Sequence, residues 1–479
     1  MLRTGSEEWW QTLRGPQCRA VDDAIEVTFW WRDPAGDETR SPHRRVWLYI
    51  TGVTDHHQNA RPQSLQRLPG TDAWFWRTTL SPTWRGSYCF IPSDRDDDFS
   101  PEVFSANAPD RALLREGWRK LLPRAIADPL NPHSWRGGRG HGVSALEMPQ
   151  APAQPGWDPL NEAHPAARCL EWRSARLGNH RRVWIYTTGE AVDPQTRPLA
   201  ILLDGQFWAE SMPVWSPLAA LTREGRLPPA VYLLIDAIDN QRRGVELPCH
   251  RDFWLAVQEE LLPLVHGYAP FSDRPDRTVV AGQSFGGLAA MFAALNWPQR
   301  FGCVLSQSGS YWWPHRDGRG TGFIGEQLRQ GEVSAAGLRV WLEAGQREPI
   351  IFRANQALLA QLTTTQQTIF WRQVDGGHDA LCWRGGLTAG LIQLWQPLLS
   401  HPWHRVLRQE FDMQFSNPFD NPQGQFYILR NDQQQYSLWP AHCDLPAGWT
   451  VVCPPQSAEA CNAWLAANWS TLTPAHHAS

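Results

Sequence analysis

The chain has 479 residues, of which 42% are hydrophobic and 19% are charged. This length exceeds what one hydrophobic core supports, and the composition excludes a disordered chain or a coiled coil. Basic and acidic residues nearly cancel to a formal net charge of −4, so no bulk field attracts nucleic acid or anionic lipid. No apolar run is long enough to cross a bilayer, and the N-terminus does not read as a secretory signal. We therefore expect a multidomain cytoplasmic protein with neither nucleic acid nor membrane as partner.

The nine cysteines are dispersed and include no C-x-x-C pair. This usage argues against structural zinc and against a disulfide framework, so we expect no metal site and no resident cofactor. The basic set is almost entirely arginine, with Lys120 as the only lysine. Lineage bias explains this simply, but the planar charged fork of arginine also suits an anionic aromatic ligand.

The first third of the sequence predicts an immunoglobulin-like β-sandwich. Short β-branched and aromatic runs alternate with Pro, Gly, Ser and Asp, which is typical of such sandwiches. The expected strands are Ile25–Trp31, Arg45–Thr51, Ala73–Leu80 and Gly86–Ile91. One amphipathic helix is expected over 110–127, and a Pro- and Gly-rich linker closes a domain at 1–160.

Residues 168–400 predict a mainly parallel sheet with helices on both faces. Short apolar runs recur there with helical stretches between them. The expected strands are Arg182–Thr187, Leu199–Asp204, Ala230–Asp236, Thr278–Gly282, Cys303–Ser306, Leu338–Ala344 and Ile369–Val374, with a closing helix at Leu387–Trp395. A small α+β module follows at 413–474, with strands at Gln425–Arg430 and Gln435–Trp439 and a helix at Ala458–Asn468.

The sequence Gly-Gln-Ser-Phe-Gly at 282–286 is a G-x-S-x-G motif between a predicted strand and a predicted helix. That context predicts an α/β-hydrolase nucleophile elbow with Ser284 as nucleophile. A serine hydroxyl needs a general base, and in this fold the histidine comes after the last strand. His378 is at that point, on a Gly-rich loop after Ile369–Val374.

The triad acid is expected after the preceding strand, which makes Glu348 the first choice. Glu343, Asp375 and Asp379 are the alternatives, as is a dyad without an acid. The oxyanion needs two backbone donors, and the N–H groups of Phe285 and of Gln206, or of a neighbour of Gln206, are the candidates.

Basic and aromatic residues follow two strands of the middle domain. Ligands of open α/β sheets bind at the carboxyl ends of strands. The candidates for binding an anionic aromatic substrate are therefore Arg243, Arg251, Trp312 and Arg316.

Residues 1–400 resemble the enterochelin (enterobactin) esterases. The resemblance rests on motifs that run along the whole region: TGVTDHHQN at 51–59, REGWRKLLP at 115–123, VVAGQSFGGL at 279–288, LSQSGSYWWPHR at 305–316 and QVDGGHDALCWRGG at 373–386. It implies a cytoplasmic serine esterase with Ser284 and His378 as the catalytic pair. The implied substrate is ferric or iron-free enterobactin and its linear fragments, and iron enters only as part of that substrate.

Residues 413–474 resemble the MbtH-like proteins, small partners of nonribosomal-peptide adenylation domains. The signature includes NPFD at 417–420, YSLWP at 436–440 and LPAGW at 445–449. It implies a partner-binding site at Ser437, Leu438, Trp439 and Trp449. Thr471 and Thr473 stand where the family often has charged residues. The segment 401–412 resembles neither family, and we hypothesise that two adjacent reading frames were joined there.

Three functions compete at this stage. The chain is a trilactone esterase, a partner that activates an adenylation enzyme of siderophore synthesis, or a general ester hydrolase or acyltransferase. Acceptance of glucosylated enterobactin, the preference for ferric or iron-free substrate and the oligomeric state stay open.

Overall fold

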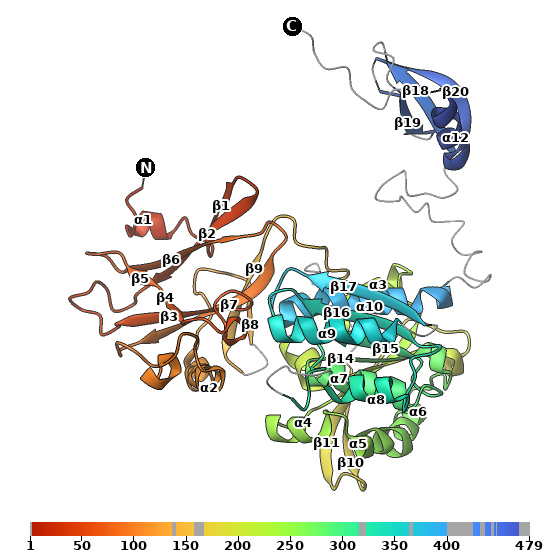
Figure 1. Ribbon diagram of the computed structural model, residues 1–479, viewed down its shortest axis with the longest axis horizontal. Helices are drawn as coiled ribbons and strands as arrows, with labels where there is room; N and C mark the ends of the chain where they lie inside the picture. The colour runs from red at the N-terminus through yellow and green to blue at the C-terminus, as the bar shows by residue number, and fades with distance from the viewer. Residues whose placement is uncertain are drawn as a thin grey trace. The chain divides into compact units, whose positions relative to one another are not determined.

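A computed structural model describes residues 2–136, 140–157, 167–315, 322–363, 367–399, 425–431, 436–441, 445–446 and 448–468. Contacts divide the chain into two compact units, residues 1–399 and residues 400–479. Figure 1 labels most of the helices and strands of both units, and each unit is described by itself.

Two antiparallel sheets form the N-terminal part of the first unit. One has the order β1-β2-β6-β5 and the other has the order β4-β3-β7-β9-β8. The strands of the first are β1 (Gln17–Val21), β2 (Ala24–Arg32), β5 (Gln66–Arg67) and β6 (Ala73–Leu80). The strands of the second are β3 (Arg45–Ile50), β4 (Gln63–Ser64), β7 (Arg85–Ser93), β8 (Ser134–Arg136) and β9 (Gly142–Glu147).

The two sheets bury one shared core, because apolar side chains from both face inward. This core includes Val27, Phe29, Trp31, Val46, Leu48, Ile50, Trp74, Tyr88 and Phe90. The four strands expected from sequence are therefore present as β2, β3, β6 and β7, and the immunoglobulin-like class of the sandwich stays a prediction. Helix α1 (Glu7–Trp10) precedes β1, and helix α2 (Arg111–Leu121) covers β7 through Leu114 and Trp118.

Two strands lie within the segment expected to be a linker. These are β8 and β9, and β9 pairs with β7 from Arg85↔Glu147 to Tyr88↔Ser144. The alternation of apolar residues in β9 is short and lies among Gly and Pro residues, so the sequence does not predict a strand there. Pairing with β7 stabilises it as one. Helix α2 also ends at Leu121, six residues earlier than 127, where a 3-10 turn (Leu122–Arg124) follows.

An eight-stranded sheet with the order β10-β11-β13-β12-β14-β15-β16-β17 forms the rest of the first unit. The pairs from β13 to β17 are parallel, and β10 and β11 add an antiparallel edge. The strands are β10 (Arg168–Ser174), β11 (Asn179–Thr188), β12 (Leu199–Leu202), β13 (Ala230–Ile235), β14 (Thr278–Gln283), β15 (Cys303–Gln307), β16 (Arg339–Gly345) and β17 (Thr368–Val374). The mainly parallel sheet predicted from sequence is confirmed, and β10 is an addition.

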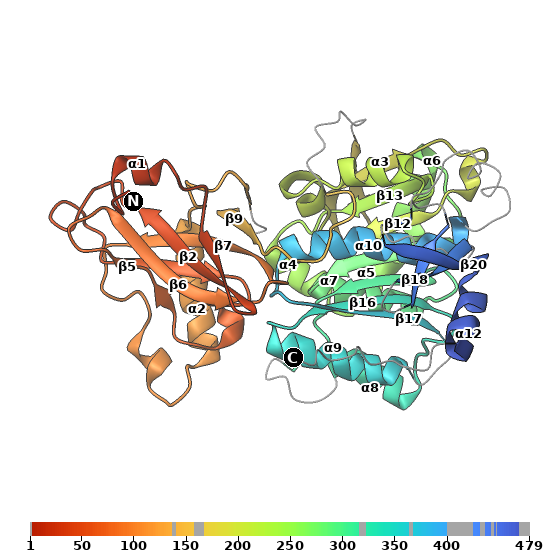
Figure 2. The ribbon, with the colours of Figure 1, turned by 90° about the horizontal axis from the view of Figure 1, so that it is seen from above.

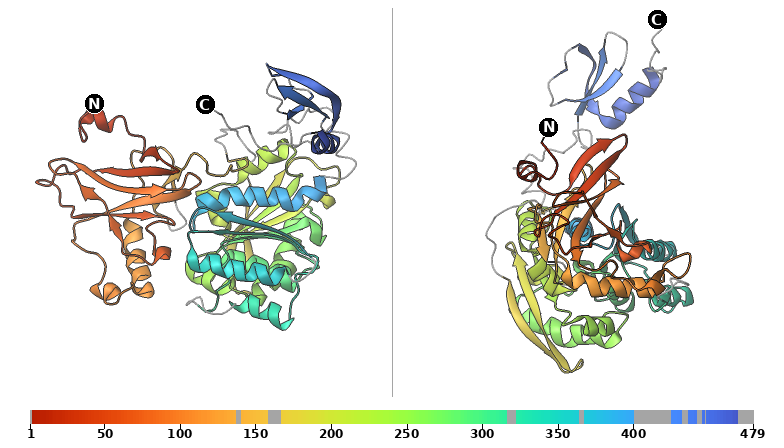
Figure 3. Two further views of the ribbon diagram at one scale, coloured as in Figure 1. Left: turned by 45° about the horizontal axis from the view of Figure 1, so that its top comes forward. Right: turned by 90° about the vertical axis from the view of Figure 1, so that its left-hand side faces the viewer.

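Helices cover both faces of this sheet, as Figure 3 shows. On one face lie α5 (Arg251–Ala256), α6 (Leu262–Tyr268), α7 (Phe285–Asn296), α8 (Gly322–Gln330) and α9 (Pro349–Leu362). On the other face lie α3 (Trp215–Arg223) and α10 (Ala380–Leu399). Helix α4 (Asn240–Glu246) follows β13. Because α7 and the central strands are buried on all sides, their sequences are nearly continuous runs of apolar residues.

The N-terminal sheets lie beside the part that holds the eight-stranded sheet, as Figure 2 shows. Hydrogen bonds join them to loops at the carboxyl ends of β16 and β17. Gln58 reaches the carbonyl of Arg347, and Ser87 reaches the carboxylate of Asp379. These are the loops on which an open α/β sheet carries its functional residues.

The second unit contains a three-stranded antiparallel sheet with the order β19-β18-β20 and one helix. Its elements are β18 (Gln425–Asn431), β19 (Tyr436–Pro440), β20 (Trp449–Ser457) and α12 (Ala458–Asn468). Phe426, Ile428, Cys453 and Cys461 form its core. Strand β20 was not expected, because it contains two consecutive prolines, Pro454 and Pro455, which are rare in strands. In the described ranges no helix is both long and apolar enough to span a bilayer.

Candidate active site

Ser284 lies in the turn between β14 and α7, and its backbone has φ 59° and ψ −121°. A non-glycine residue adopts this conformation only where the surroundings impose it. The turn is tight, since a methyl group added at Gly282 would lie 2.2 Å from the carbonyl oxygen of Gly286. The sharp strand–turn–helix that the G-x-S-x-G motif predicts is therefore present at Ser284.

The loop after β15 holds Ser284 from both sides. The Ser284 N–H donates to the carbonyl of Gln307 at 3.0 Å, and the N–H of Ser310 donates to the carbonyl of Ser284 at 3.1 Å. The two hydroxyl oxygens of Ser284 and Ser310 lie 3.4 Å apart. The two backbone hydrogen bonds fix the position of the Ser284 backbone, and therefore the point from which its side chain projects.

His378 lies on the loop between β17 and α10, and its Nδ1 atom lies 2.6 Å from Oε2 of Glu348. Glu348 is fully buried. Its other oxygen, Oε1, accepts the N–H of Gly345 at 2.8 Å and the hydroxyl of Ser308. A carboxylate held on both oxygens fixes the ring orientation of His378, so that its Nε2 atom points away from Glu348.

Ser308 connects this pair to the serine loop. It is two residues from Ser310, and its hydroxyl also accepts the indole N–H of Trp383 at 3.0 Å. The Trp383 ring packs edge-on against the His378 ring, with centroids 4.8 Å apart. Ser284 and His378 are not hydrogen-bonded to each other in the described part of the chain. Ser310, which donates to Ser284, and Ser308, which donates to Glu348, are two positions apart on one loop. Catalytic hydrogen bonds are often long without substrate.

The three other carboxylates considered from sequence have different partners. Asp375 pairs with Arg347, whose Nε lies 2.8 Å away, and Asp379 accepts the hydroxyl of Ser87 at 2.7 Å. Glu343 is buried under the site and accepts the side-chain amide of Gln307 at 2.9 Å. Burial raises the pKa of Glu343 to about 7. Of the four, Glu348 is the carboxylate that contacts His378.

Gln206 and Phe285 lie at the ends of neighbouring strands, β12 and β14. The Gln206 side-chain oxygen accepts the N–H of Ala237 at 3.0 Å, which ties its loop to the loop after β13. Asp204, two residues earlier, has φ 52° and accepts two hydrogen bonds from Arg243, at 2.7 and 2.8 Å.

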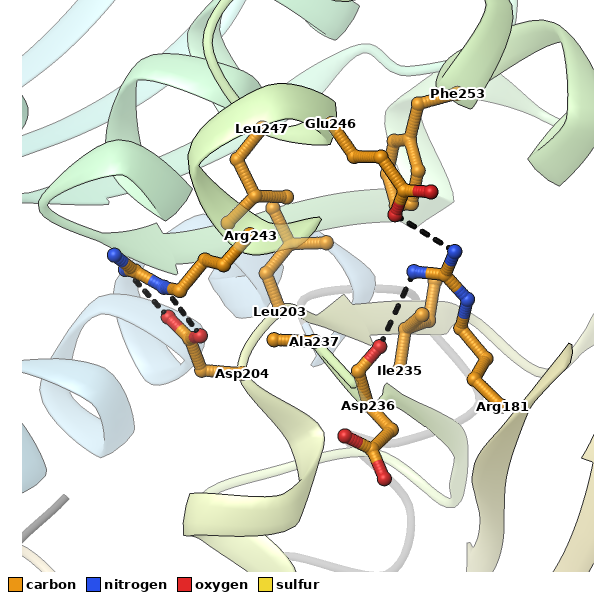
Figure 4. Close-up of a pocket in the computed structure, with 10 residues that line it drawn as sticks. All are labelled: Arg181, Leu203, Asp204, Ile235, Asp236, Ala237, Arg243, Glu246, Leu247 and Phe253. Carbon is orange, nitrogen blue, oxygen red and sulfur yellow. Dashed lines mark hydrogen bonds and ion pairs between the residues drawn. The ribbon is translucent and has the colours of Figure 1, made fainter. Parts of the chain in front are cut away.

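Arg243 therefore has its guanidinium engaged within the protein, as Figure 4 shows. It also donates to the carbonyl of Gln283 at 3.3 Å. Burial is the largest single influence and acts to lower the pKa of Arg243, but the charge of Asp204 and its hydrogen bonds together outweigh burial, so the pKa is raised. The neighbouring cavity, about 10 Å³ in volume, is walled by a second buried pair, Arg181 and Glu246, 2.7 Å apart. Such a cavity holds about one water molecule, so it is not a substrate pocket.

The other predicted substrate contacts lie in different places. The Trp312 ring lies 6.0 Å from the ring of Phe285, so it borders the turn that carries Ser284. Arg251 lies over Trp297, at the opposite end of α7 from Ser284. A helix of this length spans roughly 18 Å, and the structure does not bring Arg251 to the serine. Arg316 lies outside the described residues.

The sequence did not single out three residues at this site. Ser308 and Ser310 belong to a segment that was singled out for its aromatic and basic residues alone. His57, from the N-terminal part, lies with its ring centroid 5.1 Å from that of His378. No local signal in the sequence places His57 beside the loop at 375–379. Within the described residues no cluster of three or more His, Cys, Asp or Glu side chains suits a metal ion.

In the second unit, Ser437 and Trp439 pair with Leu429 and Tyr427 and share one sheet face. Trp449 pairs with Asn431, which places it on the same face. Leu438 points to the other face and packs against the core. Both tryptophans are half-buried, and their face is opposite the one on which Cys461 of α12 packs against Phe426 and Ile428.

Three known families match separate parts of the chain. Residues 174–394 match the family described as putative esterase, and residues 26–157 match enterochelin esterase, N-terminal. The fold and these family matches thus define an esterase of the α/β class. An iron(III) enterobactin esterase of Escherichia coli is 67% identical over 398 residues, which cover 83% of this chain and 98% of that protein. The chain belongs to the iron(III) enterobactin esterase family.

Solved structures lead to the same family. The ferric enterobactin esterase of Salmonella typhimurium has 66% identity and a TM-score of 0.79, and the match covers 83% of this chain and all of that one. The enterobactin esterase of Shigella flexneri, solved in the presence of enterobactin, has 65% identity and a TM-score of 0.76, with the same shares covered.

The second unit belongs to another family. Residues 415–479 match the family described as MbtH-like protein. The enterobactin biosynthesis protein YbdZ of Escherichia coli is 68% identical over 62 residues, which cover 13% of this chain and 86% of that protein. The chain thus carries an MbtH-like module after an enterobactin esterase.

Proposed function

We propose that this chain is a serine esterase that hydrolyses the trilactone of ferric enterobactin to N-(2,3-dihydroxybenzoyl)serine units. The observation that carries the proposal is the 2.6 Å contact between His378 and Glu348, in a chain that also has the strained strand–turn–helix at Ser284. It occurs in a chain that is 67% identical to an iron(III) enterobactin esterase.

In the proposed reaction, the Ser284 hydroxyl attacks a lactone carbonyl while Nε2 of His378 takes its proton. Glu348 holds the ring by its Nδ1–H and stabilises the imidazolium that forms. The carbonyl oxygen becomes an oxyanion, which accepts hydrogen bonds from the N–H groups of Phe285 and Gln206. When the tetrahedral intermediate collapses, the ester C–O bond breaks and His378 gives its proton to the leaving serine oxygen.

The acyl-enzyme is hydrolysed by the same groups in reverse order. His378 takes a proton from water, the hydroxide attacks the acyl carbonyl, and the Ser284 oxygen leaves with the proton from His378. Three such cycles open the ring and separate the three arms. No metal or cofactor of the protein takes part in this proposal, and iron enters only as cargo of the substrate.

Cleavage of the scaffold explains how such a reaction releases iron. One trilactone holds three catecholates close together, so each arm binds the metal at a high effective concentration set by the others. Separate monomers lack that advantage, and their iron complex is weaker. The cytoplasm is the compartment we propose, since the freed iron is used there.

Trp312 is the candidate to stack on a catechol ring, because it borders Phe285. Arg316 follows it on the same segment and is the proposed anion contact. For Arg243 the ion pair with Asp204 supports a role in holding the turn that carries Gln206, and a direct substrate contact is the alternative. Arg251, over Trp297, is retained only as a contact for a distant part of a large ligand.

The test is hydrolysis of enterobactin, followed by chromatography of the products beside a simple aryl ester. Release of dihydroxybenzoylserine with far slower turnover of the aryl ester supports the trilactone as substrate. Equal turnover of both would favour a general ester hydrolase or acyltransferase.

A second proposed function belongs to the MbtH-like module, and it is independent of the esterase. Ser437, Trp439 and Trp449 share one half-buried sheet face, which suits a docking surface for a nonribosomal-peptide adenylation domain. Leu438 supports that face from the core side. Co-expression of the full chain with an adenylation enzyme of siderophore synthesis should raise its activity, and Trp439→Ala should remove the gain while esterase turnover stays the same.

A further inference from the structure

The loop that carries His378 is bound on both flanks to the N-terminal sheets. On one flank, the Asp379 carboxylate accepts both the backbone N–H and the hydroxyl of Ser87, at 2.6 and 2.7 Å. On the other flank, the Asp375 carboxylate accepts the hydroxyl of Thr83 at 2.8 Å, and its carbonyl accepts the N–H of Arg85. Three residues of one segment, at positions 83, 85 and 87, thus hold the residues before and after the histidine.

Asp379 couples this anchor to the site itself. Its Oδ1 atom accepts the N–H of Leu381 at 2.9 Å, and its carbonyl accepts the N–H of Trp383. Asp379 therefore begins α10, the helix whose first turn carries Trp383 against the His378 ring. The carboxylate is buried, and two of its three donors come from Ser87. A displacement of β7 would move both His378 and the indole beside it.

The loop of the acid is anchored by a separate contact. The Gln58 side-chain amide donates to the carbonyl of Arg347, the residue before Glu348, at 2.7 Å. Gln58 is itself held by Asp55 at 3.0 Å. Asp55 is buried, and burial raises its pKa to about 6.

The backbones of the two parts also touch directly at this point. A methyl group added at Gly377, next to the histidine, would lie 2.5 Å from the backbone nitrogen of Gly52. Gly52 is in the left-handed region, with φ 79°, and its N–H donates to Asp55 at 3.0 Å. The segment 51–58 therefore packs against the histidine loop with no room for a side chain, and His57 from this segment faces the His378 ring.

From these contacts we infer that the N-terminal domain is part of the esterase's catalytic apparatus, with Ser87 and Gln58 as the positioning residues for His378 and Glu348. The inference rests on the proposed function. A general base works only within hydrogen-bond reach of the proton it takes, so small displacements of this pair reduce the rate more than they reduce substrate binding.

The test compares Ser87→Ala and Gln58→Ala with Ser93→Ala. Ser93 is a matched control, because it is on the same strand β7 and equally buried, but its hydroxyl accepts from Arg95 within the N-terminal domain. Loss of a hydrogen bond to a buried charged group predicts that kcat of Ser87→Ala falls about tenfold or more, with KM near its wild-type value. The kcat of Gln58→Ala should fall in the same way, and Ser93→Ala should retain the wild-type kcat.

A second readout separates positioning from a general loss of structure. Reaction of Ser284 with a fluorophosphonate reports how well the base activates the serine and needs no enterobactin. This rate should fall in Ser87→Ala and Gln58→Ala, at temperatures where all variants remain folded by circular dichroism. Equal rates and equal kcat in Ser87→Ala, Gln58→Ala and Ser93→Ala would overturn the inference.

Ser284→Ala in the same assays distinguishes this failure from failure of the proposed function. If Ser284→Ala hydrolysed enterobactin at the wild-type rate, the esterase mechanism itself would be wrong. If Ser284→Ala were inactive while Ser87→Ala and Gln58→Ala behaved like Ser93→Ala, the mechanism would stand and only the role of the N-terminal domain would fall.

Discussion

The Nδ1 atom of His378 lies 2.6 Å from Oε2 of Glu348, and the second oxygen of that carboxylate is held by Gly345 and Ser308. Glu348 is fully buried, so its geometry does not depend on solvent. Ser308 is on the same loop as Ser310, which donates to the carbonyl of Ser284. One short loop therefore contacts both Glu348, the partner of His378, and Ser284.

Replacement of this carboxylate tests the pair. Glu348→Gln keeps the size of the side chain but places an amide where Nδ1–H of His378 needs an acceptor. We expect kcat for enterobactin to fall about a thousandfold or more, because the histidine loses its orientation and the imidazolium loses its counter-charge. Glu343→Gln is the comparison, and it should retain most of the turnover. Equal losses in the two variants would mean that Glu348 is not the acid.

The backbone of Ser284 gives a prediction on stability. Its φ of 59° and ψ of −121° cost a residue with a side chain about 1 kcal/mol or more, and glycine adopts this conformation readily. Ser284→Gly and Ser284→Ala both lack the hydroxyl and should both be inactive. We expect Ser284→Gly to unfold with a free energy about 1 kcal/mol higher than Ser284→Ala, measured by urea denaturation. A less stable glycine variant would contradict the strain at this turn.

Glu343 predicts a pH dependence of stability. Burial raises its pKa from 4.5 to about 7, which means that the folded chain keeps a proton that the unfolded chain has lost. Stability from this group is therefore fully present below pH 4.5, is lost as the pH rises through about 7, and stays lost above it.

Glu343→Gln removes this titration. The difference in melting temperature, variant minus wild type, should increase between about pH 5 and about pH 8. A difference that stays flat across this range would show that Glu343 does not titrate there. Glu102→Gln, in the N-terminal part away from the site, is the control and should show no such trend.

Substitutions at Arg243 and Asp204 test whether their partly buried ion pair holds the turn that carries Gln206 or Arg243 binds the substrate. Arg243→Lys keeps the charge but loses the two parallel hydrogen bonds, at 2.7 and 2.8 Å. If the pair holds the turn that carries Gln206, kcat falls about tenfold with little change in KM, and Asp204→Asn behaves alike. An increase in KM alone, seen in Arg243→Lys and absent in Asp204→Asn, would instead assign Arg243 to substrate binding.

Much of the fold was predictable, because its strands carry their signal locally. Cys303–Gln307 and Thr278–Gln283 are short apolar runs bounded by turns, and β2 and β6 are β-branched and aromatic. Strands β9 and β20 were missed for the opposite reason. Strand β9 contains few strong strand formers, and β20 contains Pro454 and Pro455, so pairing with β7 and β18 overrides local preference.

The site divides in the same way. Ser284, His378 and Glu348 were predictable from the motif and from chain order. The loops that carry them follow parallel strands, and the carboxyl ends of parallel strands meet at one edge of the sheet. Contacts between sequence-distant parts carry no local signal, and the bonds of Gln58 and Ser87 to the loops at Arg347 and Asp379 join residues nearly 300 positions apart. Arg243, in the short helix α4, is the converse case, since a basic residue looks the same in sequence whether it faces a substrate or a partly buried carboxylate.

The most direct measurement is the product spectrum from ferric enterobactin with the wild-type chain, Ser284→Ala and His378→Ala, resolved by chromatography over time. We predict that the wild type releases linear fragments and then dihydroxybenzoylserine, and that neither variant exceeds the uncatalysed rate by more than about a thousandfold. Wild-type turnover by Ser284→Ala would contradict the account, because the trilactone would then be opened by something other than this serine.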